Sequence, residues 1–265
     1  MTDTLTTSAA EGPRFSISRS LSMTFGVLGR NIVPMMLIAL VVTAIQGVIE
    51  YILTGGVVEG ESRGSSSFLN ILSYGFITAP VTYATFQDLR GTRVGISGMM
   101  SGGFKKIARV IGAALAVGIV VVVPVVIAVM LYFASDFIGI AAGIAAAVFA
   151  FFILVTWFVL VPVQVVEDVS FTAGFGRAAG LSKGRRWGIF GLLLVYFVLI
   201  IVISIVIFGI VGVISMTAPI VGLILMIPFL ALYSVLGAIM PSVVYYLLRA
   251  EKEGIGIDEI AKVFD

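Results

Sequence analysis

Few residues in the apolar part of this chain have side chains that could do chemistry. Gln46 and Glu50 are four positions apart, so a helix would place both on one face. They form a candidate polar cavity, but Glu50 comes late in its apolar segment, where a place at the membrane boundary is the simpler interpretation. The chain has no cysteine and no histidine. It therefore lacks thiolates and the side chain best suited to acid–base and metal chemistry near neutral pH.

The remaining carboxylates offer no better setting for catalysis. Asp88, Glu167 and Asp168 each follow an apolar segment, where we expect a helix to end in solvent. No carboxylate pair has an acid–base setting, and no nucleophile has a base beside it. Gly139 and Gly143 form a Gly-x-x-x-Gly pair, which is typical of close helix packing. We therefore predict no catalytic residue, no metal, no cofactor and no enzyme activity.

The composition indicates an integral membrane protein. Of 265 residues, 60% are hydrophobic and 11% are charged, against roughly 45–50% and 25% in soluble proteins. The net charge of +2 is too small to favour nucleic acid as a partner. Residues 1–14 are predicted to be a disordered tail. Because they lack the basic start and apolar run of a cleavable signal, we expect the first apolar segment to stay as a membrane helix.

Six segments are predicted to cross the membrane as helices. A span needs about 20 mostly apolar residues. The first four are Ile32–Leu53, the weaker and more polar Ser67–Phe86, Val110–Phe133 and Ile138–Val166. Trp187–Leu248 contains no charged residue, and as one helix it would be about 93 Å long. It must therefore fold back, and Ser215–Pro219 is the polar, helix-breaking point.

The basic residues predict which side of each span faces the cytoplasm. All but Arg63 of the 16 lysines and arginines fall on one side of a six-span arrangement. By the positive-inside rule that side is cytoplasmic, and it carries both termini. We expect a bacterial inner (plasma) membrane location.

The sequence also repeats weakly in three units. The segment before the first span matches the segment before the third at an offset that aligns Arg30 with Arg109. The membrane domain, 15–249, divides into repeats of about 15–90, 94–168 and 170–249. Each repeat is predicted to be a hairpin of two spans preceded by an amphipathic helix on the cytoplasmic side. The alternative is convergence, since apolar segments with basic flanks resemble one another by composition alone.

Basic residues gather where these amphipathic helices enter the spans. We call seven of them the basic rim: Arg30, Lys105, Lys106, Arg109, Lys183, Arg185 and Arg186. One interpretation is that the rim binds anionic lipid headgroups or a phosphorylated ligand. The simpler alternative is that it only anchors the hairpins. Residues 250–265 are predicted to be a cytoplasmic tail, in which a short helix from Asp258 to Phe264 would dock on the chain itself or on a protein partner.

Short motifs also suggest a family. They are Leu181-Ser182-Lys183-Gly184-Arg185-Arg186-Trp187 at the start of a span, Tyr245-Tyr246-Leu247-Leu248-Arg249, and the terminal Val263-Phe264-Asp265. With these motifs the chain resembles the membrane-domain family named after glycerophosphoryl diester phosphodiesterase and related bacterial six-span proteins. The resemblance implies a lipid-related setting. In enzymatic members the hydrolase is a separate soluble barrel, so the resemblance implies no phosphodiesterase activity here.

Two functions follow as hypotheses. The first is a non-catalytic inner-membrane protein that engages anionic lipid or an envelope partner through the basic rim. The alternative is a small-solute transporter or channel formed by three pseudo-symmetric hairpins, which the repeat and the helix prolines favour. The sequence leaves the ligand, the pathway and the oligomeric state open.

Overall fold

The described part of the chain is built from helices. The computed structural model describes residues 14–53 and 63–254, and these ranges contain nine helices and no strand. The helices are α1 (Ile17–Leu53), α2 (Arg63–Leu89), α3 (Ile96–Phe104), α4 (Ile107–Ala134), α5 (Asp136–Thr156), α6 (Leu160–Val166), α7 (Phe171–Ser182), α8 (Arg186–Thr217) and α9 (Pro219–Glu253). The all-α prediction is confirmed over these ranges. The helix predicted from Asp258 to Phe264 lies outside the described residues.

Five helical segments are long and apolar enough to cross a membrane, which indicates a membrane protein. They are α1, α4, α5 continued by α6, α8 and α9. The predicted second span corresponds to α2, whose 27 residues would extend about 40 Å. This helix is more polar and is not among the five. The sixth span therefore stays a prediction that depends on α2.

Proline explains where several of these helices break. The fold-back predicted at Ser215–Pro219 is confirmed, because α8 ends at Thr217 and α9 begins at Pro219, a residue suited to the first helical turn. Asn31 has non-helical angles (φ −123°, ψ 17°) just before Pro34, whose ring opposes the carbonyl four residues earlier. Similarly, the predicted run Ile138–Val166 divides into α5 and α6 just before Pro162.

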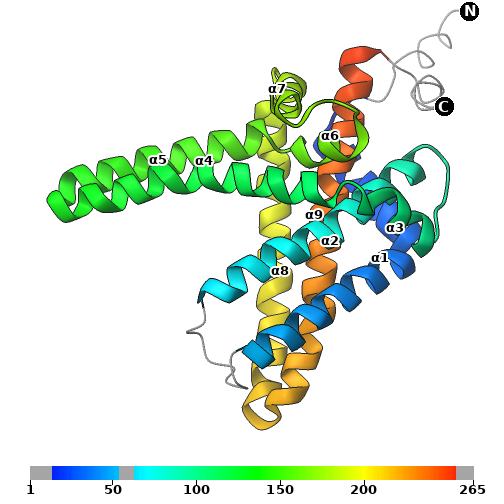
Figure 1. Cartoon of the computed structure of the whole chain (residues 1–265), viewed down its shortest axis with the longest axis horizontal. Helices are drawn as coiled ribbons and strands as arrows, with labels where there is room; N and C mark the ends of the chain where they lie inside the picture. The colour runs from blue at the N-terminus through cyan, green and yellow to red at the C-terminus, as the bar shows by residue number, and fades with distance from the viewer. Residues whose placement is uncertain (1–13, 54–62, 255–265) are drawn as a thin grey trace, which may run out of the picture.

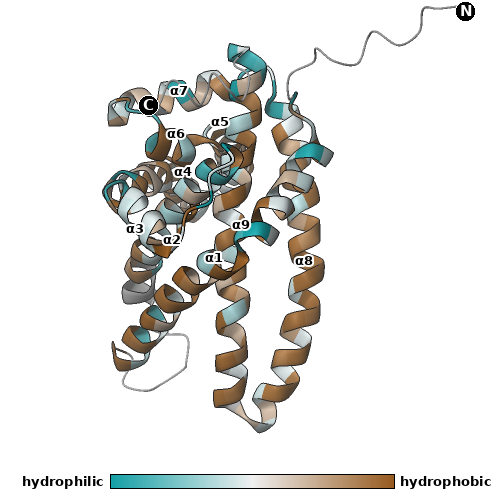
Figure 2. Ribbon diagram, turned by 90° about the vertical axis from the view of Figure 1, so that its right-hand side faces the viewer, coloured by the Kyte–Doolittle hydropathy of each residue, from teal (hydrophilic) through white to brown (hydrophobic). Residues whose placement is uncertain are grey.

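The long helices form three pairs that spread from one end of the molecule. Figure 1 shows α1–α2, α4–α5 and α8–α9 diverging from the side of the molecule that holds α6, α7 and the end of α9, with α3 beside α1 and α2. The α4–α5 pair projects farthest from the other helices. In Figure 2 the α8–α9 pair is apolar along most of its length. Polar residues gather toward the end of the molecule that lies away from the turn between α8 and α9. Within the described ranges, most charged residues thus lie where the helix pairs converge.

The core of this convergent end is the last third of α9. Every residue from Ser242 to Ala250 is buried, and α1, α2, α6, α7 and α8 all pack against α9. The large side chains of Tyr245, Leu247 and Leu248 are fully buried. The bundle therefore has a solid helix at its centre here.

The segments predicted to be amphipathic pack on the protein itself. Phe15, just before α1, lies against Gly188, and Ile17 of α1 lies against Gly191. Both glycines belong to α8, so this helix covers part of the first segment that was predicted to be amphipathic. Phe25, farther along α1, is 42% exposed. In α3, Gly103 sits directly on the backbone of Pro80. Placement of these helices in a membrane interface stays a prediction.

Candidate functional site

The most developed polar cluster is a closed ring of five side chains from α6–α7 and α9. Arg177 Nε donates to Glu167 Oε1 and Oε2 at 3.0 and 2.9 Å, and Arg177 Nη2 donates to Glu253. Arg249 Nε donates to Glu253 Oε2 at 2.8 Å, and Arg249 Nη1 donates to Tyr245 Oη at 3.1 Å. Tyr245 Oη donates to Glu167 Oε1 at 2.5 Å and closes the cycle. We call these five residues the charged ring.

Burial makes the charged ring a structural element of the convergent end. Glu167, Arg249 and Tyr245 are 9%, 8% and 0% exposed. Two carboxylates and two guanidinium groups balance in charge, which a buried cluster requires. Burial by itself would lower the pKa of Arg177, but hydrogen bonds to Glu167 and Glu253 outweigh it and raise that pKa above its ordinary value. The expectation that Glu167 ends its helix in solvent is wrong, because α7 and α9 cover it.

The last turn of α9 also ties three other segments together. Glu251 accepts hydrogen bonds from Phe15 N at 3.1 Å and from Arg185 Nε at 2.8 Å. Lys252 Nζ donates to the carbonyl oxygens of Gly180 and Lys183 at 2.7 and 2.6 Å, where α7 ends. The start of α1, the end of α7 and the start of α8 are therefore all held by α9.

A second buried carboxylate holds the kink in α1. Asp88, which is 8% exposed, accepts from Arg30 Nη2 at 2.6 Å and from Arg30 Nε at 3.1 and 3.3 Å. It also accepts from Asn31 Nδ2 at 2.8 Å. The expectation that Asp88 is solvated is wrong, since it joins the end of α2 to α1. Asp168, in contrast, has a side chain that is 96% exposed, as expected.

The structure divides the predicted basic rim into two sets. Three members are neutralised by carboxylates of the chain: Arg30 by Asp88, Lys106 by Asp168 at 3.1 Å, and Arg185 by Glu251. The other four have no carboxylate partner among the described residues: Lys105, Arg109, Lys183 and Arg186. Arg186 instead lies over the ring of Phe152, 4.7 Å from its centroid. We call these four residues the unpaired rim.

Gln46 and Glu50 do meet, as predicted, but together with a residue of α2. Gln46 Nε2 donates to Glu50 Oε1 at 3.0 Å and to Asn70 Oδ1 at 2.7 Å. Polar side chains bonded between helices help to hold them together in a membrane. The hydrogen bond from Gln46 thus gives Asn70, a polar residue of the weak second span, a partner on α1. The polar cavity at Gln46 and Glu50 stays a prediction.

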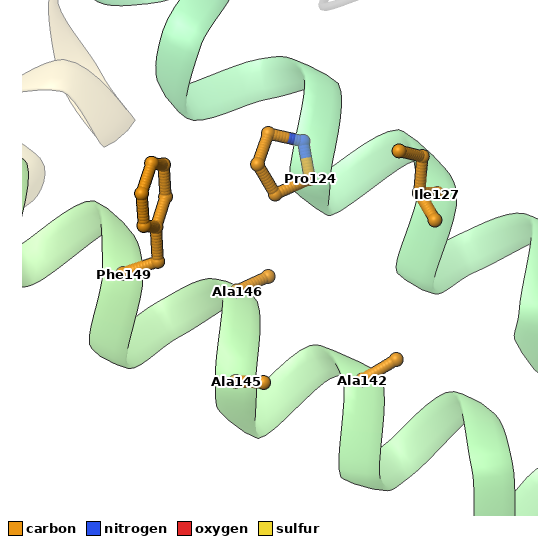
Figure 3. Close-up of a pocket in the computed structure, with 6 residues that line it drawn as sticks. All are labelled: Pro124, Ile127, Ala142, Ala145, Ala146 and Phe149. Carbon is orange, nitrogen blue, oxygen red and sulfur yellow. The ribbon is translucent and has the colours of Figure 1, made fainter.

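Two open apolar grooves lie along the long helices. One, of about 370 Å³, runs between α4 and α5, where small alanine side chains leave space opposite Pro124 (Figure 3). Its lining is Pro124, Ile127, Ala142, Ala145, Ala146 and Phe149. The other, of about 420 Å³, lies between α1 and the α8–α9 pair. Among the described residues, no group of three histidine, cysteine or acidic side chains is placed to hold a metal.

Comparison of the chain with protein-family models, with curated proteins and with solved structures gave no match. The resemblance to the membrane-domain family therefore stays a prediction from short motifs. Arguments about function have to start from the helices and the charged residues described above.

Proposed function

We propose that this chain is a non-catalytic, six-span bacterial inner-membrane protein that binds anionic lipid headgroups through the unpaired rim. The supporting observation is that the acidic residues at the convergent end are paired with basic residues of the chain. Asp88, Asp168, Glu167, Glu251 and Glu253 each form an ion pair with a base of the chain. Their charge is thus already balanced, and Lys105, Arg109, Lys183 and Arg186 contribute a surplus of positive charge.

The three-hairpin arrangement gains support from three ion pairs of one kind. Arg30–Asp88 and Lys106–Asp168 each fall within a single predicted repeat, and Arg185–Glu251 joins the third repeat to a residue two positions after its predicted end. In each pair the base lies near the point where the amphipathic segment joins the first span of the hairpin. The acid lies near the end of the second span. The three pairs have similar places in their hairpins, but the repeat alignment matches Arg30 with Arg109 rather than with Lys106. We infer that each repeat is one hairpin closed at its cytoplasmic end.

The strength of the proposed lipid contact follows from membrane electrostatics. A lysine or arginine near an anionic surface contributes about 1 kcal/mol, and the attraction falls off within a Debye length. The two exposed members of the unpaired rim, Lys105 and Lys183, would together give a preference of about 2 kcal/mol for anionic over neutral surfaces. Raising the salt concentration should weaken this preference.

The variant Lys105→Gln/Lys183→Gln tests the proposal. It removes two charges from the unpaired rim and should lower the affinity for phosphatidylglycerol relative to phosphatidylcholine by roughly thirty-fold, from about 2 kcal/mol. Native mass spectrometry of the purified protein in lipid mixtures would measure the ratio of bound lipids. The matched control, Lys106→Gln/Asp168→Asn, removes a balanced and exposed pair and should leave the ratio unchanged. Equal effects of the two variants, or a wild type without preference, would contradict the proposal.

The transporter alternative gains no support from the centre of the bundle. A pathway between three hairpins would run where the last third of α9 lies, and Val243, Val244 and Leu247 are fully buried there. A protein partner at the C-terminal tail stays a prediction, because residues 255–265 lie outside the described part of the chain.

A further inference from the structure

The α4–α5 hairpin is joined to the rest of the protein through a helix break at each end. At its start the chain leaves α3 at Phe104 and enters α4 at Ile107. At its other end, residues 157–159 separate α5 from α6. Lys106, just before α4, pairs with Asp168, just after α6, at 3.1 Å. The chain therefore enters and leaves the hairpin on the same side, and both breaks flank its base.

Pro162 accounts for the second break. It has no N–H to donate to the carbonyl of Phe158, and the N–H of Leu160 bonds to the carbonyl of Trp157, only three residues earlier. Trp157 and Val159 have non-helical angles (φ −103°, ψ 19° and φ −95°, ψ 14°). A helix bends most readily where proline interrupts its hydrogen bonds, so α5 can change direction relative to α6 at this point.

Beyond its base, little of the hairpin is covered by other helices. Between Ala113 of α4 and Ile153 of α5, the buried residues are three small ones: Ala128, Gly139 and Ala146. Gly139 sits on the backbone of Tyr132, at the contact between the two helices of the hairpin. A ring contact with α8, from Phe151 to Phe190, lies near the base. Packing therefore holds α4 and α5 to each other, but it does not fix the direction of the outer part of the pair.

The direction of the hairpin conflicts with a flat bilayer. Figure 1 shows α4–α5 running across the direction of α8–α9, yet all four helices belong to segments that are long and apolar enough to cross a membrane. The 28 residues of α4 extend about 42 Å, against about 30 Å of hydrocarbon. Spanning helices tilt by about 0–40° from the bilayer normal. Two pairs that cross one flat bilayer must therefore run more nearly alongside each other.

We propose that α4–α5 is a hinged hairpin, which turns as one body about Lys105–Lys106 and residues 157–159 and brings its tip toward the tip of α8–α9 in a bilayer. The tilt of a long apolar helix follows the thickness of the hydrocarbon. A thin bilayer therefore leaves the hairpin more inclined, and a thick one makes it more upright. This device needs only that the two pairs cross the membrane. It does not depend on headgroup binding by the unpaired rim, so the two proposals can fail separately.

The distance between spin labels at the two tips tests the hinge. The chain has no cysteine, so labels attach only where cysteine is introduced. Phe133→Cys and Met216→Cys place labels at side chains that are 85% and 86% exposed. These positions lie about 39 and 45 Å from the starts of α4 and α8. Pairs at right angles from one base would have tips about 60 Å apart, whereas neighbouring parallel pairs would have them within about 30 Å.

Electron–electron double resonance would measure this distance in nanodiscs of phosphatidylcholine, whose neutral headgroup does not engage the unpaired rim by net charge. We expect the shorter distance, and an increase of roughly 5 Å or more from long-chain to short-chain lipid. Val126→Cys/Ile144→Cys, with one label on each helix of the hairpin, should report a constant distance. Tips about 60 Å apart in every lipid, a tip distance that does not vary with thickness, or an equal change within the hairpin would overturn the proposal.

Two proline variants test where the hairpin turns. Pro162→Ala supplies the missing N–H, favours one continuous helix from α5 into α6, and should remove most of the response to bilayer thickness. Pro124→Ala is the matched control, because Pro124 lies inside the unbroken α4, and it should keep the response. Equal effects of the two variants would contradict the hinge at residues 157–159. The wild-type distances decide whether the hairpin turns even if Pro162→Ala does not fold.

Discussion

Glu167 gives the sharpest test of the charged ring. Glu167→Ala removes the acceptor of Arg177 and of the fully buried Tyr245 hydroxyl. An unsatisfied buried donor costs about 1–3 kcal/mol. Breaking a fully buried ion pair costs about 3–5 kcal/mol, but the side chain of Arg177 is 33% exposed and keeps Glu253 as a partner. We therefore expect a loss of about 2–4 kcal/mol in the free energy of unfolding.

Thermal unfolding in detergent micelles would measure this loss. At about 2–4 °C per kcal/mol for a chain of this size, Tm should fall by roughly 5–15 °C. Asp168→Asn is the matched control, since its exposed pair with Lys106 should be worth less than about 1 kcal/mol. A double-mutant cycle of Glu167→Gln with Arg177→Met should give a coupling energy of about 0.5–3 kcal/mol. Additive effects, or an equal fall of Tm in Asp168→Asn, would refute the closed ring.

Two further predictions concern packing and the end of α9. In Gly103→Ala, the new Cβ would lie 2.5 Å from Pro80 Cα, so stability should fall by about 1–3 kcal/mol. In Gly118→Ala, no atom lies within 4 Å of the new Cβ, so this variant should be neutral or slightly stabilising, and thermal unfolding of both variants checks this. A chain that stops after Ala250 loses the hydrogen bonds of the last α9 turn and should unfold at a lower temperature than one that stops after Gly254. Equal Tm values for the two truncations would contradict the role given to that turn.

Hydrophobicity made the long helices predictable from the sequence. An apolar segment of sufficient length must satisfy its backbone within the membrane, and a helix does this locally. The break before Pro219 was also predictable from local sequence, because proline and its polar neighbours disfavour a continuous helix in the adjacent backbone. The split between α5 and α6 before Pro162 was not predicted, although the same proline effect accounts for it. Helix prolines such as Pro124 and Pro241 leave α4 and α9 unbroken, so the residue type alone does not predict a break.

Long-range partners could not be predicted. Asp88 lies 58 residues from Arg30, and Glu167 lies 78 residues from Tyr245. Such separations leave no periodic pattern, so each carboxylate looks like an ordinary solvated helix end. One signal was available: an acid follows each predicted hairpin in a chain whose acids are few. Because an unpaired carboxylate next to apolar spans is costly, each of these acids could have been expected to require a base.

The pairing of these acids changes what the charge asymmetry can mean. A count of basic residues alone does not distinguish members of the basic rim, so all seven are interpreted either as anchors or as lipid-binding residues. In the structure Arg30 and Arg185 hold helices through Asp88 and Glu251, so their charge is already used within the fold. Lys105 and Lys183 are exposed and lie within two residues of Lys106 and Arg185, whose charges are paired. The two interpretations therefore apply to different residues of the same rim, and substitution of neighbouring residues such as Lys105 and Lys106 can separate them.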